Sequence, residues 1–121
     1  MEISIKQCSE SEALEILNDR SIAKLLSVKP ESIKEDYVLL IVDEMLLVLA
    51  KPEKQSIEIH VACRFRDRAF VRDTMLSGIK WLESCGFTTI WTTAPDSRKG
   101  LTKLLESIGF LKVQERWVYG N

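Results

Sequence analysis

The feature that most limits the fold is a near-repeat in the second half of the chain. The sequence LESCGF occupies residues 82–87, and LESIGF occupies residues 105–110, 23 positions further on. A glycine and an apolar residue after a helical run are typical of a helix that ends in a left-handed residue, with the apolar side chain folded back on its last turn. We therefore predict two helices that end at Gly86 and Gly109.

Apolar residues with helical periodicity precede both glycines. They are Val71, Met75, Ile79 and Leu82, with Gly78 in the same stripe, and then Leu101, Leu104, Leu105 and Ile108. Strands are predicted at 88–93 and 111–119, and a strictly alternating strand at 56–63. A strand, a helix and a parallel strand in this order form a right-handed crossover, so strands 56–63 and 88–93 should be parallel.

The first half of the chain predicts three more strands and two helices. Residues 2–8 alternate, and Ser9 and Glu12 have the spacing of a capping box that opens a helix. A second short helix, with Ile22, Leu25 and Leu26 on one face, must end at Pro30. The apolar runs 37–42 and 45–50 predict a hairpin of interior strands, after which residues 52–55 turn the chain.

These elements make one α/β domain, residues 1–121, with a mixed sheet of about six strands covered by helices on both faces. The chain has 121 residues, of which 45% are apolar, and this size and composition suit a single domain. The chain has seventeen basic and eighteen acidic residues, so it lacks the large positive net charge of a protein that coats nucleic acid. No apolar stretch could span a membrane and no secretory signal opens the sequence, so we expect a cytoplasmic protein.

The alternating strand carries the first candidate site. Glu58 and His60 share a face at a spacing of two, where a carboxylate can orient an imidazole that takes a proton from an amine. The alternative is a histidine that packs against the sheet and is satisfied by hydrogen bonds. With a single histidine and three scattered cysteines in the chain, a metal site is not expected.

An arginine-rich segment follows this strand. Arg64, Arg66, Arg68 and Arg72 stand against Asp67 and Asp73, just where a helix begins. A helix N-terminus combined with arginines favours contact with an anion, which could be a nucleotide phosphate, nucleic acid or an acidic protein. The alternative is a solvated charged loop. Nucleic acid is the weakest of these partners, because the rest of the chain is slightly acidic.

The last predicted strand, 111–119, has Trp117 and Tyr119 on one face. If this strand lies at the edge of the sheet, its free backbone groups can pair with a strand of another chain, and its exposed aromatic residues can pack against that chain. We therefore expect self-association through the C-terminal strand.

The order of elements, with LESIGF before the last strand, resembles the GNAT (Gcn5-related N-acetyltransferase) fold. Within it, Glu-Ile-His at 58–60 without a glycine loop is similar to small head-assembly or internal virion proteins of short-tailed phages. GNAT domains usually carry two strands where one is predicted here. Their Arg-Gly-x-Gly-x-Gly/Ala loop holds the pyrophosphate of acetyl-CoA, and the resemblance assigns this role to Arg64, Arg66, Asp67, Arg68 and Ala69, with Phe65 and Asp67 in place of glycines.

A second departure from the resemblance lies before Gly109. Arg98 stands where GNAT enzymes usually have asparagine, and Leu105 where a tyrosine acts as general acid. Because leucine cannot protonate a thiolate, the resemblance implies that acetyl transfer is weakened or lost. The likeness to phage proteins then implies a role in phage assembly, through contact with a virion protein partner. The alternative is an active N-acetyltransferase that uses acetyl-CoA, with Glu58 or His60 as base.

Overall fold

The computed structural model describes the backbone of residues 4–18, 33, 35–43, 46–63 and 68–120, and their side chains except those of 63 and 68–70. The elements are β1 (Ile5–Gln7), α1 (Glu10–Leu17), β2 (Val38–Val42), β3 (Leu46–Glu53), β4 (Ser56–Cys63), α3 (Arg68–Ser84), β5 (Thr89–Thr92), α4 (Lys99–Ile108), β6 (Phe110–Val113) and β7 (Arg116–Tyr119). The second predicted helix, within 19–32, lies outside the described residues.

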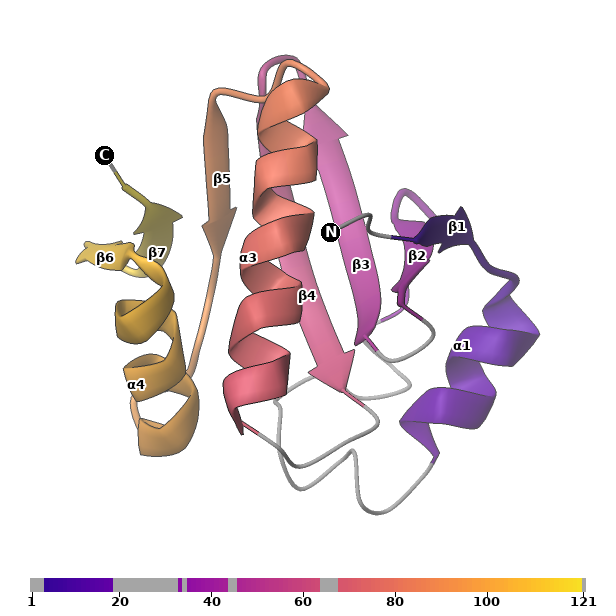
Figure 1. The fold of residues 1–121 in the computed structure, drawn as a ribbon, viewed down its shortest axis with the longest axis horizontal. Helices are drawn as coiled ribbons and strands as arrows, with labels where there is room; N and C mark the ends of the chain where they lie inside the picture. The colour runs from indigo at the N-terminus through magenta and orange to yellow at the C-terminus, as the bar shows by residue number, and fades with distance from the viewer. Residues whose placement is uncertain (1–3, 19–32, 34, 44–45, 64–67, 121) are drawn as a thin grey trace.

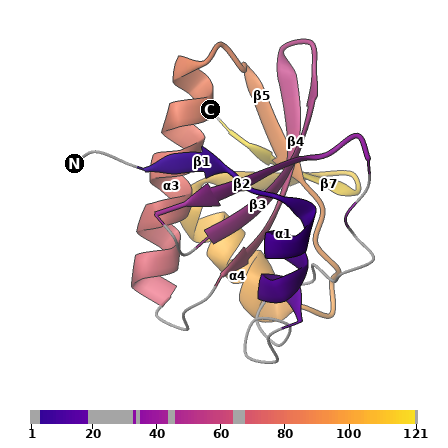
Figure 2. The ribbon, with the colours of Figure 1, turned by 90° about the vertical axis from the view of Figure 1, so that its right-hand side faces the viewer.

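The strands form one sheet in the order β1-β2-β3-β4-β5-β7-β6. Strands β4 and β5 are parallel, as predicted, and every other neighbouring pair is antiparallel. Figure 1 shows α3 lying along β4 and α4 beside β6 and β7, and Figure 2 places α1 on the other side of the strands from α3. The predicted α/β fold with a mixed sheet is therefore confirmed, with seven strands instead of about six.

The extra strand comes from the C-terminal segment. Residues 111–119 were predicted as one strand, but the chain reverses at Gln114 and Glu115, and Val113 pairs with Arg116. Gln114 takes a left-handed conformation with a φ of 58°, and no glycine or asparagine marks this turn. The single-strand prediction was wrong because pairing of the two arms outweighs the small cost of a left-handed glutamine.

Strand β3 also extends further than predicted. It runs through Pro52 to Glu53, and the turn lies at Lys54, whose φ is 58°. Proline is tolerated there because Ala50 pairs with Val38, the first residue of β2, so beyond Ala50 β3 has a neighbouring strand on one side only. The predicted turn at 52–55 is therefore shortened by two residues.

Both glycine helix ends are confirmed. Gly86 and Gly109 have φ values of 104° and 117°. After α3, the N–H of Phe87 donates to the carbonyl of Leu82 at 3.3 Å and the N–H of Gly86 donates to that of Glu83 at 3.0 Å, which is the Schellman pattern. The capping box at Ser9 and Glu12 is present as well.

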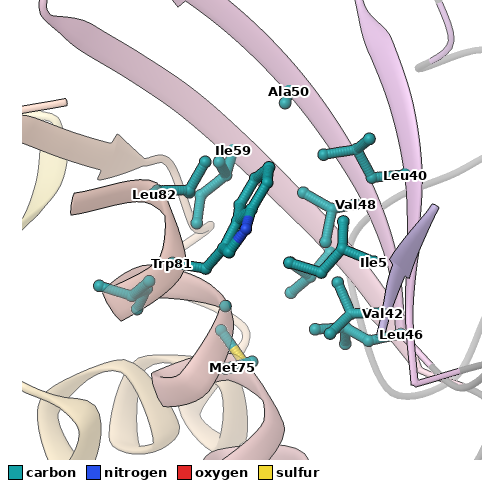
Figure 3. A pocket seen from close by; sticks show the side chains of 13 residues that line it. Ile5, Leu40, Val42, Leu46, Val48, Ala50, Ile59, Met75, Trp81 and Leu82 are labelled. Atoms are coloured by element: carbon teal, nitrogen blue, oxygen red, sulfur yellow. The ribbon is translucent and has the colours of Figure 1, made fainter. Parts of the chain in front are cut away.

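An apolar pocket lies between α3 and the first four strands. Figure 3 shows the indole of Trp81 beside it, between side chains of α3 and side chains of the sheet. It holds about 440 Å³ of space, part of it open to solvent, and all lining residues are apolar or glycine. Because no polar side chain converges on it to orient a ligand, we read this pocket as a gap in the apolar packing between α3 and the sheet.

Gly78 lines this gap, and we expect Gly78→Ala to stabilise the protein. A Cβ built at this position meets no atom within 4 Å, and the residue lies inside α3. Alanine loses less backbone entropy on folding than glycine, so the free energy of unfolding should rise by about 0.5–1 kcal/mol. Urea denaturation of both proteins measures the change.

The matched control is Gly86→Ala, at the end of the same helix. Its surroundings are equally open, but its φ of 104° is strained for any residue with a Cβ. This variant should lose at least about 1 kcal/mol. Equal effects of the two substitutions would contradict the assignment of the helix end.

Candidate functional site

Strands β4 and β5 separate halfway along β4. Strand β4 pairs with β3 along its whole length, from Ser56 to Cys63, but with β5 only from Ser56 to Glu58. Figure 1 shows the two strands diverging toward their C-terminal ends. Beyond Glu58, one edge of the β4 backbone therefore has no strand beside it in the described part of the sheet.

A pocket occupies this divergence. It holds about 340 Å³ of space, part of it open to solvent. Its walls come from β4, the end of β5, the start of β6, and helices α3 and α4. The lining residues are Ile59, His60, Val61, Met75, Thr92, Thr93, Leu101, Leu105 and Phe110. His60, Thr92 and Thr93 are the polar residues among them, and His60 is the one whose side chain can act as a base.

His60 belongs to a hydrogen-bonded group of three side chains. Its Nε2 lies 2.5 Å from Oε2 of Glu58, and the hydroxyl of Tyr37 donates to the same oxygen at 2.8 Å. The rings of Tyr37 and His60 meet edge to face, with centroids 6.2 Å apart. The side chains of His60 and Glu58 are 20% and 18% exposed, so the group lies at the surface of the sheet but is largely shielded from water.

The charge state of this group follows from its contacts. Partial burial raises the pKa of Glu58, but hydrogen bonds from His60 and Tyr37, with the positive charge of Lys51, outweigh it and hold that pKa below its usual value. Burial, followed by the hydrogen bond to Glu58, raises the pKa of Tyr37 to about 12. At neutral pH, Glu58 is thus ionised and Tyr37 keeps its proton.

An ionised Glu58 determines which nitrogen of His60 carries hydrogen. A carboxylate can only accept, so Nε2 of the imidazole donates to Glu58. In the neutral ring, Nδ1 then has a free lone pair that can accept a proton, and the carboxylate stabilises the resulting imidazolium. The arrangement is that of a carboxylate-oriented general base.

We expect Tyr37→Phe to destabilise the protein by about 1–2 kcal/mol at neutral pH, because a hydrogen bond to a charged group is lost. The Glu58 pKa is lowered on folding, so this contribution is present above its ordinary value of 4.5 and lost as pH falls through the folded value. The Tyr37 pKa is raised from 10.0 to about 12, so the contribution also disappears as pH rises through that range.

Urea denaturation of the wild type and Tyr37→Phe at pH 7 and pH 3.5 measures this difference. It should be largest at pH 7 and clearly smaller at pH 3.5. Tyr119→Phe is the matched control, since the hydroxyl of this half-buried residue has no hydrogen bond within the described part of the chain. A difference that stays constant with pH would contradict the ionic hydrogen bond.

The structure brings together two of the predicted site residues, Glu58 and His60. Arg64, Arg66 and Asp67 lie outside the described residues. Arg68 and Ala69 open helix α3, as predicted, and their side chains are not described. The assignment of a pyrophosphate loop therefore stays a prediction.

Two other positions singled out in the sequence lie in or directly before α4. Leu105 is 2% exposed and forms part of the pocket wall, so an apolar side chain stands where the resemblance places a tyrosine. Arg98 directly precedes α4. Tyr37 was missed, because nothing in a sequence links a residue before one strand to a carboxylate 21 positions later.

The expected aromatic edge strand is corrected. Strand β7 lies between β5 and β6, so β6 forms the edge of the sheet. Trp117 is only 6% exposed, while Leu111 and Val113 of β6 are 62% and 55% exposed. Trp117 and Tyr119 therefore pack inward, and Tyr119 contacts Phe110 edge to face.

The described residues contain no group of three or more His, Cys, Asp or Glu side chains that could hold a metal ion. Among their helices, none combines the length and the apolar character needed to cross a bilayer.

Comparisons with known proteins identify the fold. No family model matches the chain, and no curated protein matches it by sequence. Solved structures do match. The ribosomal-protein-S18-alanine N-acetyltransferase of Escherichia coli is 14% identical, with a TM-score of 0.69 over 97% of this chain and 91% of that one.

Two further structures agree. A Bacillus subtilis acetyltransferase in complex with CoA is 19% identical, with a TM-score of 0.64 over 91% of this chain and 77% of that one. A GNAT-family acetyltransferase of Streptococcus pneumoniae is 12% identical, with a TM-score of 0.64 over 97% of both chains. The chain therefore has the GNAT fold. These comparisons give no support to the expected phage head-assembly role.

Proposed function

We propose that this chain is an acyl-CoA-dependent N-acetyltransferase that acts on an amine. The observation that carries the proposal is the position of His60, which is oriented by Glu58 and lines the pocket between the diverging strands. A base oriented in this way, at a pocket of this fold, suits the removal of a proton from an attacking amine. The GNAT neighbours, one of them solved with CoA, support this choice of reaction.

The residues around the pocket are compatible with CoA. The free edge of β4 beyond Glu58 offers backbone donors and acceptors to an extended chain of amides. The N-terminus of α3 follows β4, and we assign the pyrophosphate to Arg64, Arg66, Arg68 and the backbone as far as Ala69. When bound, acetyl-CoA supplies the acyl group: the amine forms a C–N bond to it as the C–S bond breaks and the thiolate leaves.

The protein's own part in the reaction is the handling of a proton. Nδ1 of His60 takes the proton of the acceptor amine, and Glu58 balances the imidazolium charge through Nε2. Tyr37 holds Glu58 in place through its hydroxyl. Leu105 supplies no proton, so the departing thiolate takes one from water.

A GNAT-fold protein that works through protein contacts is the second candidate function. It is favoured by Leu105, which closes the pocket wall where a general acid would stand. The exposed Leu111 and Val113 on the edge strand would suit a protein partner or a second copy. A virion component is one partner of this kind, although no comparison points to it.

Calorimetric titration of acetyl-CoA and of CoA, followed by a thiol-release assay with a panel of amines, separates the two functions. The proposed transferase should bind acetyl-CoA in the micromolar range, melt at a higher temperature in its presence, and release thiol when an amine is added. Absence of binding at millimolar acetyl-CoA would contradict the proposal and favour the protein-contact function.

A further inference from the structure

A second group of side chains lies on the same face of the sheet as Glu58. Glu58 pairs with Trp91 across the parallel strands β4 and β5, and Trp91 pairs with Val118 of β7. Paired residues share a face, and so do residues two apart on a strand, which adds Arg116 to this face. His60, two residues after Glu58, also lies there, so the general base and Arg116 face the same space.

Arg116 is held over the ring of Trp91. Its guanidinium carbon lies 3.9 Å from the ring centroid, while Arg116 is exposed and Trp91 half-buried. Arg116 forms no ion pair within the described part of the chain. Stacking uses the flat face of a guanidinium and leaves the N–H groups at its edge free to bind an anion, a geometry that matches a carboxylate.

The face thus presents ionised Glu58 with a cation on each side of it: Lys51 on β3, which pairs with Asp36, and Arg116 over Trp91. Ionised Glu58 attracts an ammonium, and Arg116 attracts a carboxylate. Neighbouring strands lie about 4.8 Å apart, and Trp91 is one strand away from Glu58. The Trp91 ring, which carries the guanidinium, therefore lies within reach of a small molecule whose ammonium is at Glu58.

We propose that the acceptor is an amino acid, bound with its amino group at Nδ1 of His60, where the negative charge of Glu58 attracts it, and with its carboxylate at Arg116. This inference rests on the proposed function, because it assigns the second substrate of the same site. The rim of Trp91 then contacts the apolar part of the acceptor, and the carboxylate contact places the amine nitrogen beside the imidazole. A simple amine lacks the group that Arg116 binds and should be the poorer ligand.

The test compares amino acids with the matched amines that lack the carboxylate. L-Phenylalanine is paired with phenethylamine, and L-alanine with ethylamine. Binding is followed by NMR of the ¹⁵N-labelled protein through the indole N–H of Trp91, assigned with Trp91→Phe. At least one amino acid should shift this signal and bind about tenfold or more tightly than its amine, the usual effect of a charge-assisted hydrogen bond.

Arg116→Gln should remove this preference, and Arg116→Lys should retain part of it. Lys112→Gln is the control, because this exposed cation pairs with Asp96 and stands opposite Trp117, on the other face of the sheet from Arg116. Equal binding of amino acid and amine, no binding of either in both pairs, or an unchanged preference in Arg116→Gln would overturn the inference.

Thiol release with acetyl-CoA and the same four acceptors distinguishes this inference from the proposed function. Amino acid binding that depends on Arg116, without thiol release, would contradict the transferase and keep the amino acid site. Equal transfer to amino acid and amine, unaffected by Arg116→Gln, would keep the transferase and overturn the amino acid site.

Discussion

His60→Gln should lower kcat/KM for acetyl transfer by about 10²- to 10⁴-fold, the usual contribution of a general base. Glutamine fits the space but cannot take a proton from the amine. Glu58→Gln should have a smaller effect, about 10- to 100-fold, because the imidazole remains but loses the ionic hydrogen bond at Nε2. Steady-state thiol release over a range of acceptor concentrations, at saturating acetyl-CoA, measures both effects.

The control is Glu53→Gln, an exposed glutamate at the end of β3, which should keep full activity. Calorimetry should show that His60→Gln and Glu58→Gln still bind acetyl-CoA, since neither residue is assigned to the cofactor. Full activity of His60→Gln would show that this histidine is a packing residue, as the alternative interpretation of the sequence holds.

Phe110→Ala should be the most destabilising of the single substitutions discussed. Phe110 is 1% exposed, begins β6, contacts Tyr119 edge to face and forms part of the pocket wall. Removal of a fully buried phenylalanine costs about 3–5 kcal/mol, from lost burial and the cavity left behind. Urea denaturation measures the fall in the free energy of unfolding.

Leu111→Ala is the matched control, one residue further along the same strand. Its side chain is 62% exposed on the opposite face of the sheet, so the change should stay within about 0.5 kcal/mol. A comparable loss in both variants would contradict the register of β6 against β7.

Local patterns in the sequence were enough to predict most of the elements. The glycines of the two LESxGF segments end helices, because only a residue without a Cβ adopts a φ near 110° at little cost. The alternation of 56–63 assigned Glu58 and His60 to one face, and the structure joins them by a hydrogen bond. These predictions succeeded because each depends on residues within a few positions of one another.

Contacts between distant segments could not be predicted in the same way. Tyr37 reaches Glu58 because β2 and β4 are both neighbours of β3, and Arg116 reaches Trp91 because β7 inserts between β5 and β6. The turn at Gln114 carries no glycine, so one strand seemed sufficient where there are two. The error placed Trp117 at an edge, whereas it is buried.

The sequence by itself thus determined most of the described helices and strands, the apolar face of each of these, and the carboxylate–imidazole pair on β4. Periodicity, caps and glycine ends act over short distances, so these properties can be derived without the fold. Tertiary structure alone decided the order of the strands, the divergence of β4 from β5 and the partners of Glu58 and Trp91. These depend on which distant segments pair, and the gain from burying the whole core decides that pairing.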